Sequence, residues 1–249
     1  MNALFLQGVS KRFGGLYAVS DITMDVAHGE RRALIGPNGA GKTTLFNVIA
    51  GDLPASGGEI NLFGQNVTRM PVHRRVGLGL RRTYQRSALF DALTVAQNLY
   101  LGVLGPNRGH FDMLSLAQKD ATRSPRVAEV AESVGLVDRL EACAGELSHG
   151  ERRQLEFGLA IASEPRLVML DEPMSGLSPE ERVKIVKLLE TLPRKVTLLL
   201  IEHDMDVALS VAKRVTVLHE GRVIAEGSPE EISANSLVQQ VYLGEKVND

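Results

Sequence analysis

A glycine-rich segment at residues 36–44 constrains the fold of this 249-residue chain more strongly than any other feature. It reads Gly36-Pro-Asn-Gly-Ala-Gly41-Lys42-Thr43-Thr44 and fits the pattern G-x-x-x-x-G-K-[ST]. An apolar run at 32–36 precedes it, and residues 45–50 have the composition of a helix. A strand, a loop and a helix in this order direct backbone N–H groups and a helix N-terminus at phosphate. The segment therefore predicts a nucleoside-triphosphate site on an α/β sheet.

The side chains of this loop have distinct expected roles. The Lys42 ammonium would reach the β- and γ-phosphates, and the Thr43 hydroxyl would ligate Mg²⁺. The expected nucleotide-binding residues are Gly36, Pro37, Asn38, Gly39, Ala40, Gly41, Lys42, Thr43 and Thr44. A chance glycine-rich turn is the alternative, and the strand and helix on either side argue against it.

Apolar runs of strand length divide the remainder of the chain into two kinds of sheet. The runs at 167–170 and 196–201 are almost continuously apolar, which is typical of parallel strands covered on both faces. Antiparallel strands are predicted from alternation and glycines at 4–7, 18–26 and 58–63, and a hairpin at 214–225 that turns at Glu220-Gly221. Residues 93–140 have a helical pattern and predict a helical lobe inserted into the α/β core.

Composition excludes several classes of protein. The net charge of −2, the absence of Trp and an aromatic content of 4% argue against a nucleic-acid partner. The single cysteine, Cys143, has no partner for an intramolecular disulfide, which fits a reducing compartment. Neither a secretory signal nor an apolar stretch of membrane-spanning length is expected, so a membrane role would require partner subunits.

Two carboxylates follow the apolar run at 167–170. Ligands of open α/β sheets bind at the carboxyl ends of strands, so Asp171 is placed to hold a metal ion and Glu172 to activate a water. Charged loops are common, and this interpretation depends on the phosphate loop being present. Further along, Ser148 and Glu151 form an S-x-x-E capping box at a helix predicted to begin near Arg152.

Together, these motifs resemble the ATP-binding cassette (ABC) family over essentially the whole chain. The segment at 36–44 is similar to the Walker A motif, and Leu147-Ser-His-Gly-Glu151 is similar to the signature motif, which is the most specific of the set. Other similar motifs are Phe13 as the adenine-stacking A-loop aromatic, Gln85 as the Q-loop, Asp171 and Glu172 as Walker B, residues 175–178 as the D-loop and His203 as the switch histidine.

The resemblance implies a P-loop NTPase (RecA-like) α/β fold with an antiparallel β subdomain and an inserted helical subdomain. It implies one ABC ATPase domain over 1–249, in which 1–92 and 159–249 form the core lobe and 93–158 the helical subdomain with the signature motif. ATP would bind Walker A of one subunit and contact the Ser148, His149, Gly150 and Glu151 turn of a facing subunit. Lys42, Gln85, Glu172 and His203 would be catalytic, and Thr43, Gln85 and Asp171 would hold Mg²⁺.

The implied partners are two transmembrane permeases, a second ATPase subunit in a head-to-tail dimer and a periplasmic or extracellular substrate-binding protein. The chain would then lie at the cytoplasmic face of the cell membrane. The segments 79–85, 89–99, 201–205 and 241–245 resemble the branched-chain amino-acid importer branch, in which a heterodimer with a paralogue is natural. Urea or amide importers, aromatic-acid importers and the lipopolysaccharide-export ATPase share much of this pattern and remain alternatives.

Several residues depart from the family pattern. His149 and Glu151 replace the usual Gly and Gln of the signature, and Ser178 stands where the D-loop often has Asp. Taken singly, Gln85 is a polar loop residue, Phe13 a core residue of the β layer and His203 an ordinary strand-end residue; their common spacing favours the functional interpretation. The pairs Arg81-Arg82 and Arg152-Arg153 are expected on solvated faces.

Three other classes of protein fit less well. A soluble ABC ATPase of DNA repair or translation would carry a coiled-coil insertion or tandem cassettes. A GTPase would carry an Asn-Lys-x-Asp element, and a kinase would leave residues 148–151 without a role. A catalytically dead cassette is disfavoured because Lys42, Asp171, Glu172 and His203 are all present.

Overall fold

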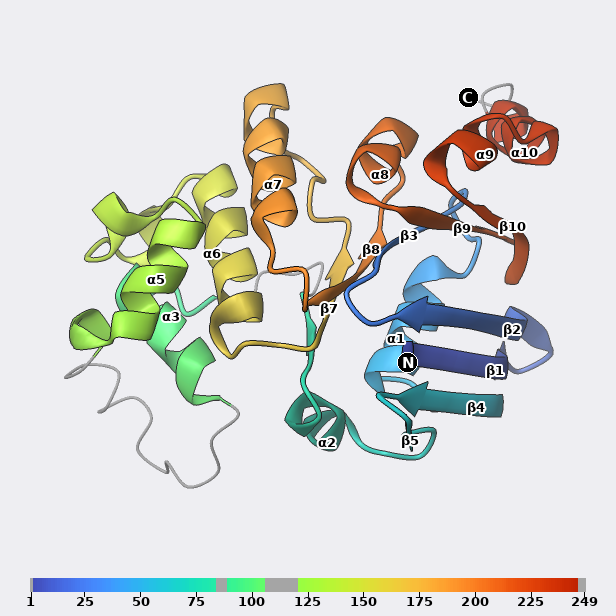
Figure 1. Ribbon diagram of the computed structural model, residues 1–249, viewed down its shortest axis with the longest axis horizontal. Coiled ribbons are helices and arrows are strands. Elements are labelled where there is room, and N and C mark those ends of the chain that lie inside the picture. Colours follow the sequence, from blue (N-terminus) through green and yellow to red (C-terminus); the bar gives the residue numbers. More distant parts are fainter. Residues whose placement is uncertain (1, 84–88, 106–120, 246–249) are drawn as a thin grey trace.

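The computed structural model describes residues 2–83, 89–105 and 121–245 and contains two β-sheets (Figure 1). The six-stranded sheet has the order β10-β9-β3-β8-β7-β6, and the four-stranded sheet has the order β2-β1-β4-β5. Within the larger sheet, β3 pairs in parallel with β8 and β9, β8 with β7, and β7 with β6. The predicted parallel core and antiparallel layer are therefore confirmed.

The strands of the larger sheet are β3 (Arg31–Ile35), β6 (Leu80–Arg82), β7 (Leu167–Asp171), β8 (Thr197–Ile201), β9 (Arg214–His219) and β10 (Arg222–Gly227). The strands of the smaller sheet are β1 (Asn2–Phe13), β2 (Leu16–Ala27), β4 (Gly57–Leu62) and β5 (Gln65–Asn66). The hairpin predicted at 214–225 is formed by β9 and β10, and Glu220 and Gly221 at its turn have φ of 47° and 74°.

The helices are α1 (Lys42–Ala50), α2 (Val72–Gly77), α3 (Val95–Leu104), α5 (Pro125–Ser133), α6 (His149–Ala162), α7 (Pro179–Thr191), α8 (Met205–Val211), α9 (Pro229–Ser233) and α10 (Ser236–Glu245). Short 3₁₀ turns occupy Ala121–Arg123, Val137–Arg139 and Ala144–Glu146. None of the described helices is long and apolar enough to span a membrane.

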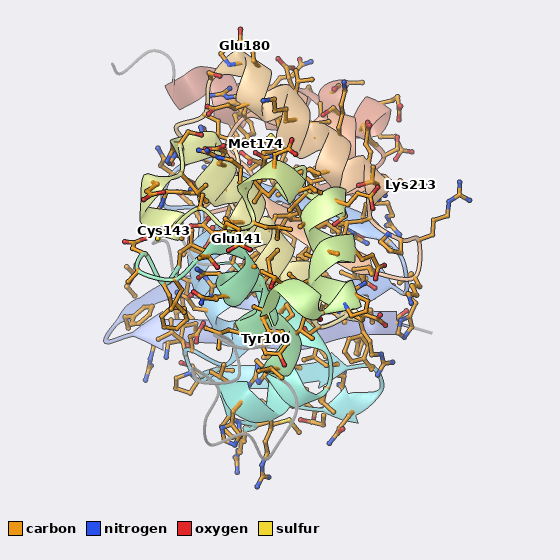
Figure 2. All side chains as sticks on the ribbon, turned by 90° about the vertical axis from the view of Figure 1, so that its left-hand side faces the viewer. Tyr100, Glu141, Cys143, Met174, Glu180 and Lys213 are labelled. Atoms are coloured by element: carbon orange, nitrogen blue, oxygen red, sulfur yellow. The ribbon has the colours of Figure 1, made fainter. Side chains whose placement is uncertain are left out.

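Helices α3, α5 and α6 gather into a lobe beside α7 and the β7–β6 end of the larger sheet (Figures 1 and 2). Their apolar side chains share one core with Val168 of β7 and Leu198 of β8. The loop that contains Cys143 pairs with the start of α3, because Val95 N–H donates to Ala142 O at 3.0 Å. Helix α6 runs to Ala162 and so continues past the expected lobe boundary at 158.

Helix α1 belongs to a second core, which lies between the two sheets. Its Leu45 and Phe46 pack with residues of β1, β2 and β4 on one side and with Leu34, Met169 and Leu199 of the larger sheet on the other. Burial of such side chains contributes about 1.5–3 kcal/mol each. This packing fixes the N-terminus of α1 at the edge of the sheet where β3 ends.

Candidate active site

Three neighbouring parallel strands, β3, β8 and β7, bring sequence-predicted residues to one edge of the larger sheet. Leu34 of β3 and Asp171 of β7 both stand in register with Ile201 of β8. The glycine-rich loop after β3, Glu202 and His203 after β8, and Glu172 after β7 therefore leave the sheet side by side. This edge is where open α/β sheets bind ligands.

The loop after β3 wraps around the amino group of Lys42. Lys42 is 6% exposed, and its Nζ donates to the backbone carbonyls of Gly36 and of Pro37, the latter at 2.9 Å. Asn38 and Gly39 at the tip of the loop are exposed, and Thr43 and Thr44 in the first turn of α1 are half-buried. The ammonium group and the N-terminus of α1 thus face the same place, as an anionic phosphate requires.

The hairpin β9–β10 and strand β2 form the wall behind this loop. Gly221 N–H donates to Ala40 O at 3.0 Å, and Ser20 N–H donates to Gly221 O at 2.8 Å. A Cβ at Gly41 would lie 2.3 Å from Ala18 O, so a side chain cannot be accommodated there. Residues far apart in sequence therefore set the shape of the loop.

Asp171 is buried at the end of β7 and forms an ion pair with Arg82. Its Oδ2 lies 3.0 Å from Arg82 Nη2, and Arg82 Nη1 donates to Asn47 at 2.6 Å and to Asp52 at 2.9 Å. Burial raises the pKa of the Asp171 carboxyl, and the neighbouring Arg82 opposes that rise. Asp171 Oδ1 has no hydrogen-bond partner within the described part of the chain. An oxygen that is buried and unsatisfied at this point suits a hard cation such as Mg²⁺.

The expectation of solvated arginine pairs was wrong. The Arg82 side chain is 6% exposed, and Arg81 donates to Ser163 Oγ at 2.7 Å and to the Val76 carbonyl. Arg152 pairs with Asp91 at 2.7 Å, and Arg153 with Glu156 at 2.8 Å. Gln85, the remaining predicted metal contact, lies outside the described residues.

Glu172 and His203 flank a second buried carboxylate. Glu172 has φ of 49°, and its N–H donates to Ile201 O at 3.0 Å, while the His203 side chain is 53% exposed. Glu202, which sequence reasoning missed, is fully buried between them and accepts from Met174 N–H at 3.3 Å. Burial raises the Glu202 pKa to about 7, and the charges of Glu172 and Asp204 add to this effect. Its position directly after a continuous apolar strand was the available sequence signal.

The Ser148 turn caps α6 as predicted. Ser148 Oγ accepts from Glu151 N–H at 3.2 Å, and Glu151 Oε2 accepts from Ser148 N–H at 2.8 Å. Glu151 also pairs with Arg139 at 2.9 Å. The hydrogen bond from Ser148 N–H lowers the pKa of Glu151 most, and Arg139 lowers it further. His149 is exposed and Gly150 is buried. Helix α6 packs in the core of the helical lobe, whereas α1 packs in the core between the two sheets. The Ser148 turn and the Lys42 loop therefore begin helices that belong to different hydrophobic cores.

Phe13 lies at the end of the β1–β2 hairpin and is 49% exposed. Lys11 Nζ lies 5.0 Å from the centre of its ring. The side chain is therefore not part of the β-layer core and is accessible to a planar ligand.

Known protein families and proteins match this chain along nearly its whole length. A family model described as "ABC transporter" matches residues 19–175, and one described as "Branched-chain amino acid ATP-binding cassette transporter" matches residues 222–248. The high-affinity branched-chain amino acid transport ATP-binding protein BraF of Pseudomonas aeruginosa is 36% identical, over 97% of this chain and 98% of BraF. LivG of Escherichia coli, described by the same words, is 35% identical over 97% of this chain and 98% of LivG. A solved ATP-binding cassette of an ABC transporter in its ADP conformation superposes with a TM-score of 0.85, at 29% identity, over 98% and 99% of the two chains.

Proposed function

Because this chain belongs to the ABC transporter family and is an ATP-binding subunit that hydrolyses ATP, we propose that it energises the uptake of branched-chain amino acids. The main support for branched-chain amino acids as the cargo is the match of residues 222–248 to the branched-chain amino-acid family model. BraF and LivG, which are similar over nearly their full lengths, support the same choice.

In the proposed reaction, the loop around Lys42 holds the triphosphate of ATP. The exposed ring of Phe13 stacks on adenine, and the ammonium group of Lys42 leaves the loop carbonyls for the β- and γ-phosphates. Glu172 accepts the proton of the attacking water, and the exposed His203 imidazole hydrogen-bonds the γ-phosphate or that water. Their common origin at the edge of β7 and β8 supports this assignment.

Mg²⁺ would be held by Asp171 Oδ1 and the Thr43 hydroxyl, with Gln85 as a further expected contact. The described residues contain no group of three His, Cys, Asp or Glu side chains suited to a metal, so phosphate oxygens would complete the coordination. When bound, the ion neutralises charge on the phosphates. Arg82 opposes the rise that burial causes in the Asp171 pKa, and it occupies Oδ2, which leaves Oδ1 for the ion.

ABC ATPases work with transmembrane permeases and as dimers, and a related cassette has been solved as a dimer. We propose that this chain binds the cytoplasmic face of two permeases and pairs head to tail with a second ATPase subunit, either a paralogue or another copy. In this arrangement Ser148 and Gly150 contact the nucleotide on the facing subunit, and a substrate-binding protein delivers the amino acid outside the membrane.

The ATPase assignment is tested by Glu172→Gln. We expect ATP binding to persist, steady-state hydrolysis to fall by at least about 100-fold, and an ATP-stabilised dimer to accumulate. Glu156→Gln, on α6 and paired with Arg153, is the control and should hydrolyse normally. Normal turnover by Glu172→Gln would remove Glu172 from the role of base.

The cargo is tested by deleting the gene and measuring uptake of labelled leucine, isoleucine and valine at low concentration. Uptake should fall and be restored by the wild-type gene but not by Glu172→Gln. Undiminished uptake of all three, with loss of urea, amide or aromatic-acid uptake or of lipopolysaccharide export, would overturn the proposed cargo.

A further inference from the structure

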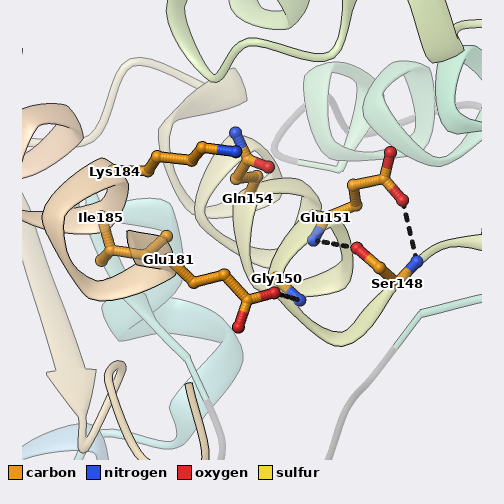
Figure 3. Close-up of a pocket in the computed structure, with 7 residues that line it drawn as sticks. All are labelled: Ser148, Gly150, Glu151, Gln154, Glu181, Lys184 and Ile185. Atoms are coloured by element: carbon orange, nitrogen blue, oxygen red, sulfur yellow. Dashed lines mark hydrogen bonds between the residues drawn. The ribbon is translucent and has the colours of Figure 1, made fainter. Parts of the chain in front are cut away.

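One carboxylate joins the N-termini of α6 and α7 (Figure 3). Glu181 Oε1 accepts from Gly150 N–H at 3.1 Å, and Glu181 Oε2 accepts from Ser178 N–H at 2.9 Å. Ser178 caps α7 and closes its box with Glu181, while Gly150 belongs to the turn that Ser148 caps. The two turns that the family resemblance identifies as the signature motif and the D-loop are therefore linked within one chain.

The approach of Glu181 to Gly150 depends on the absence of a side chain at position 150. A Cβ there would lie 2.3 Å from Glu181 Oε1. The His149 side chain also lies close to the D-loop turn, because a Cβ at Gly176 would lie 3.3 Å from His149 Nε2. His149, which departs from the family pattern, thus occupies the space beside a glycine of the other turn.

Of the two carboxylates that line this pocket, Glu181 is the one that accepts from Gly150 N–H. Glu151 lines the same small pocket, but its oxygens are directed to Ser148 N–H and to Arg139. Lys184 and Gln154 complete the polar lining (Figure 3). Gly150 N–H, one of the groups proposed to meet a phosphate across the dimer, is thus already occupied by a carboxylate of its own chain.

We propose that Glu181 is a positioning residue that sets the ATP concentration at which the dimer closes. Its carboxylate holds Gly150 N–H until a phosphate on the facing subunit takes its place, and it then remains bound to Ser178 N–H. This inference rests on the proposed function, since it requires Gly150 to contact nucleotide across a dimer.

The physical basis is competition between two anions for one donor. A carboxylate and a phosphate cannot share Gly150 N–H, and they repel each other at hydrogen-bonding distance. Closure therefore requires the Glu181–Gly150 hydrogen bond to break, which raises the ATP concentration needed. The bond to Ser178 keeps the released carboxylate near, so it returns when phosphate leaves.

The test is Glu181→Gln in the assembled transporter. Gly150 N–H and Ser178 N–H donate to different oxygens of Glu181, and a glutamine keeps only one acceptor oxygen, so it cannot reproduce both hydrogen bonds. It also carries no charge and does not repel phosphate. We expect the KM for ATP to fall about threefold to tenfold and to depend less on salt. The kcat should stay within about twofold of wild type, and the affinity of the isolated chain for nucleotide should not change.

Glu231→Gln is the matched control. Glu231 occupies the same position in the Ser228 capping box of α9, with Ser228 N–H at 2.8 Å, and its box lies in a different part of the chain. It should leave the KM for ATP unaltered. An unchanged or higher KM for Glu181→Gln, or a fall in kcat alone, would overturn the proposal. A wild-type complex without ATPase activity would instead contradict the proposed function, so the two failures are distinguishable.

Discussion

Arg82 Nη2 lies 3.0 Å from Asp171 Oδ2, and both side chains are almost wholly buried. The aspartate proposed as the metal ligand is thus held by a cation from β6, the strand that leads to Gln85. Arg82 also contacts Asn47 of α1 and Asp52 just after it, so one guanidinium joins β7, β6 and the end of the helix that follows the phosphate loop.

Arg82→Met should destabilise the protein and weaken its response to Mg²⁺. Removing one member of a buried ion pair costs on the order of 3 kcal/mol, visible as a lower Tm. Because Arg82 lowers the pKa of Asp171, its loss raises that pKa further, and a protonated Asp171 cannot bind the ion. The Mg²⁺ concentration for half-maximal ATPase activity should rise, more at pH 6 than at pH 8. Arg153→Met breaks a pair on α6 and should leave the Mg²⁺ requirement unchanged; a similar Mg²⁺ shift in both variants would contradict this account.

Glu202→Gln should make the protein more stable at high pH. The folded-state pKa of Glu202, about 7, is above its ordinary value of 4.5, so the folded protein binds this proton more tightly than the unfolded chain. Wild-type stability therefore falls as pH rises between these two values. The variant lacks that loss and can still accept from Met174 N–H. Denaturant unfolding at pH 8 should show a gain on the order of 2 kcal/mol, vanishing near pH 4.5. An equal difference at both pH values would mean that Glu202 titrates normally.

Ser148→Ala and Ser228→Ala separate capping from nucleotide contact. Each serine caps a helix through a reciprocal box, so each substitution should cost about 1 kcal/mol of stability. Only Ser148 is proposed to contact nucleotide across the dimer, so only Ser148→Ala should also raise the KM for ATP. The KM for ATP and the Tm should be measured for both variants. An equal KM for the two variants would mean that Ser148 only caps α6 and does not contact nucleotide.

Phe13→Ala should weaken the binding of ATP but not of inorganic triphosphate. Loss of stacking on the base costs roughly 1–3 kcal/mol, whereas the phosphates depend on the Lys42 loop. Tyr17→Ala removes another exposed aromatic of the same hairpin, 52% exposed, and serves as the control. Calorimetric titration with both ligands is the measurement. An equal loss for ATP and triphosphate would show that Phe13 supports the loop and does not bind the base.

Features determined within a few residues were predictable from the sequence. The phosphate loop lies between β3 and α1 because its glycines and flanking apolar residues specify that geometry locally. The Ser148–Glu151 capping box formed as expected because its donors and acceptors are three residues apart. The parallel strands followed from their continuous apolar composition.

Features that depend on distant partners were not predictable. Arg82 was expected in solvent because its partners Asn47 and Asp171 are 35 and 89 residues away. The second oxygen of Glu181 reaches Gly150 across 31 residues, although its capping box with Ser178 can be read from the sequence. The position of Glu202 directly after an apolar strand indicates burial, but its neighbour Glu172 is brought to it only by the pairing of β7 with β8.

The wall of β2 and the β9–β10 hairpin behind the phosphate loop affects how mutational surveys of this protein should be interpreted. Gly221 is distant from Lys42 in sequence, yet its N–H donates to Ala40 O, and a Cβ there would lie 2.9 Å from Ala18 O. A screen that scores only nucleotide affinity would rank Gly221 among the ligand contacts. Its substitution would act indirectly: Gly221 supports the phosphate loop from behind and determines the shape of the loop that binds ATP, without being one of the residues proposed to contact ATP.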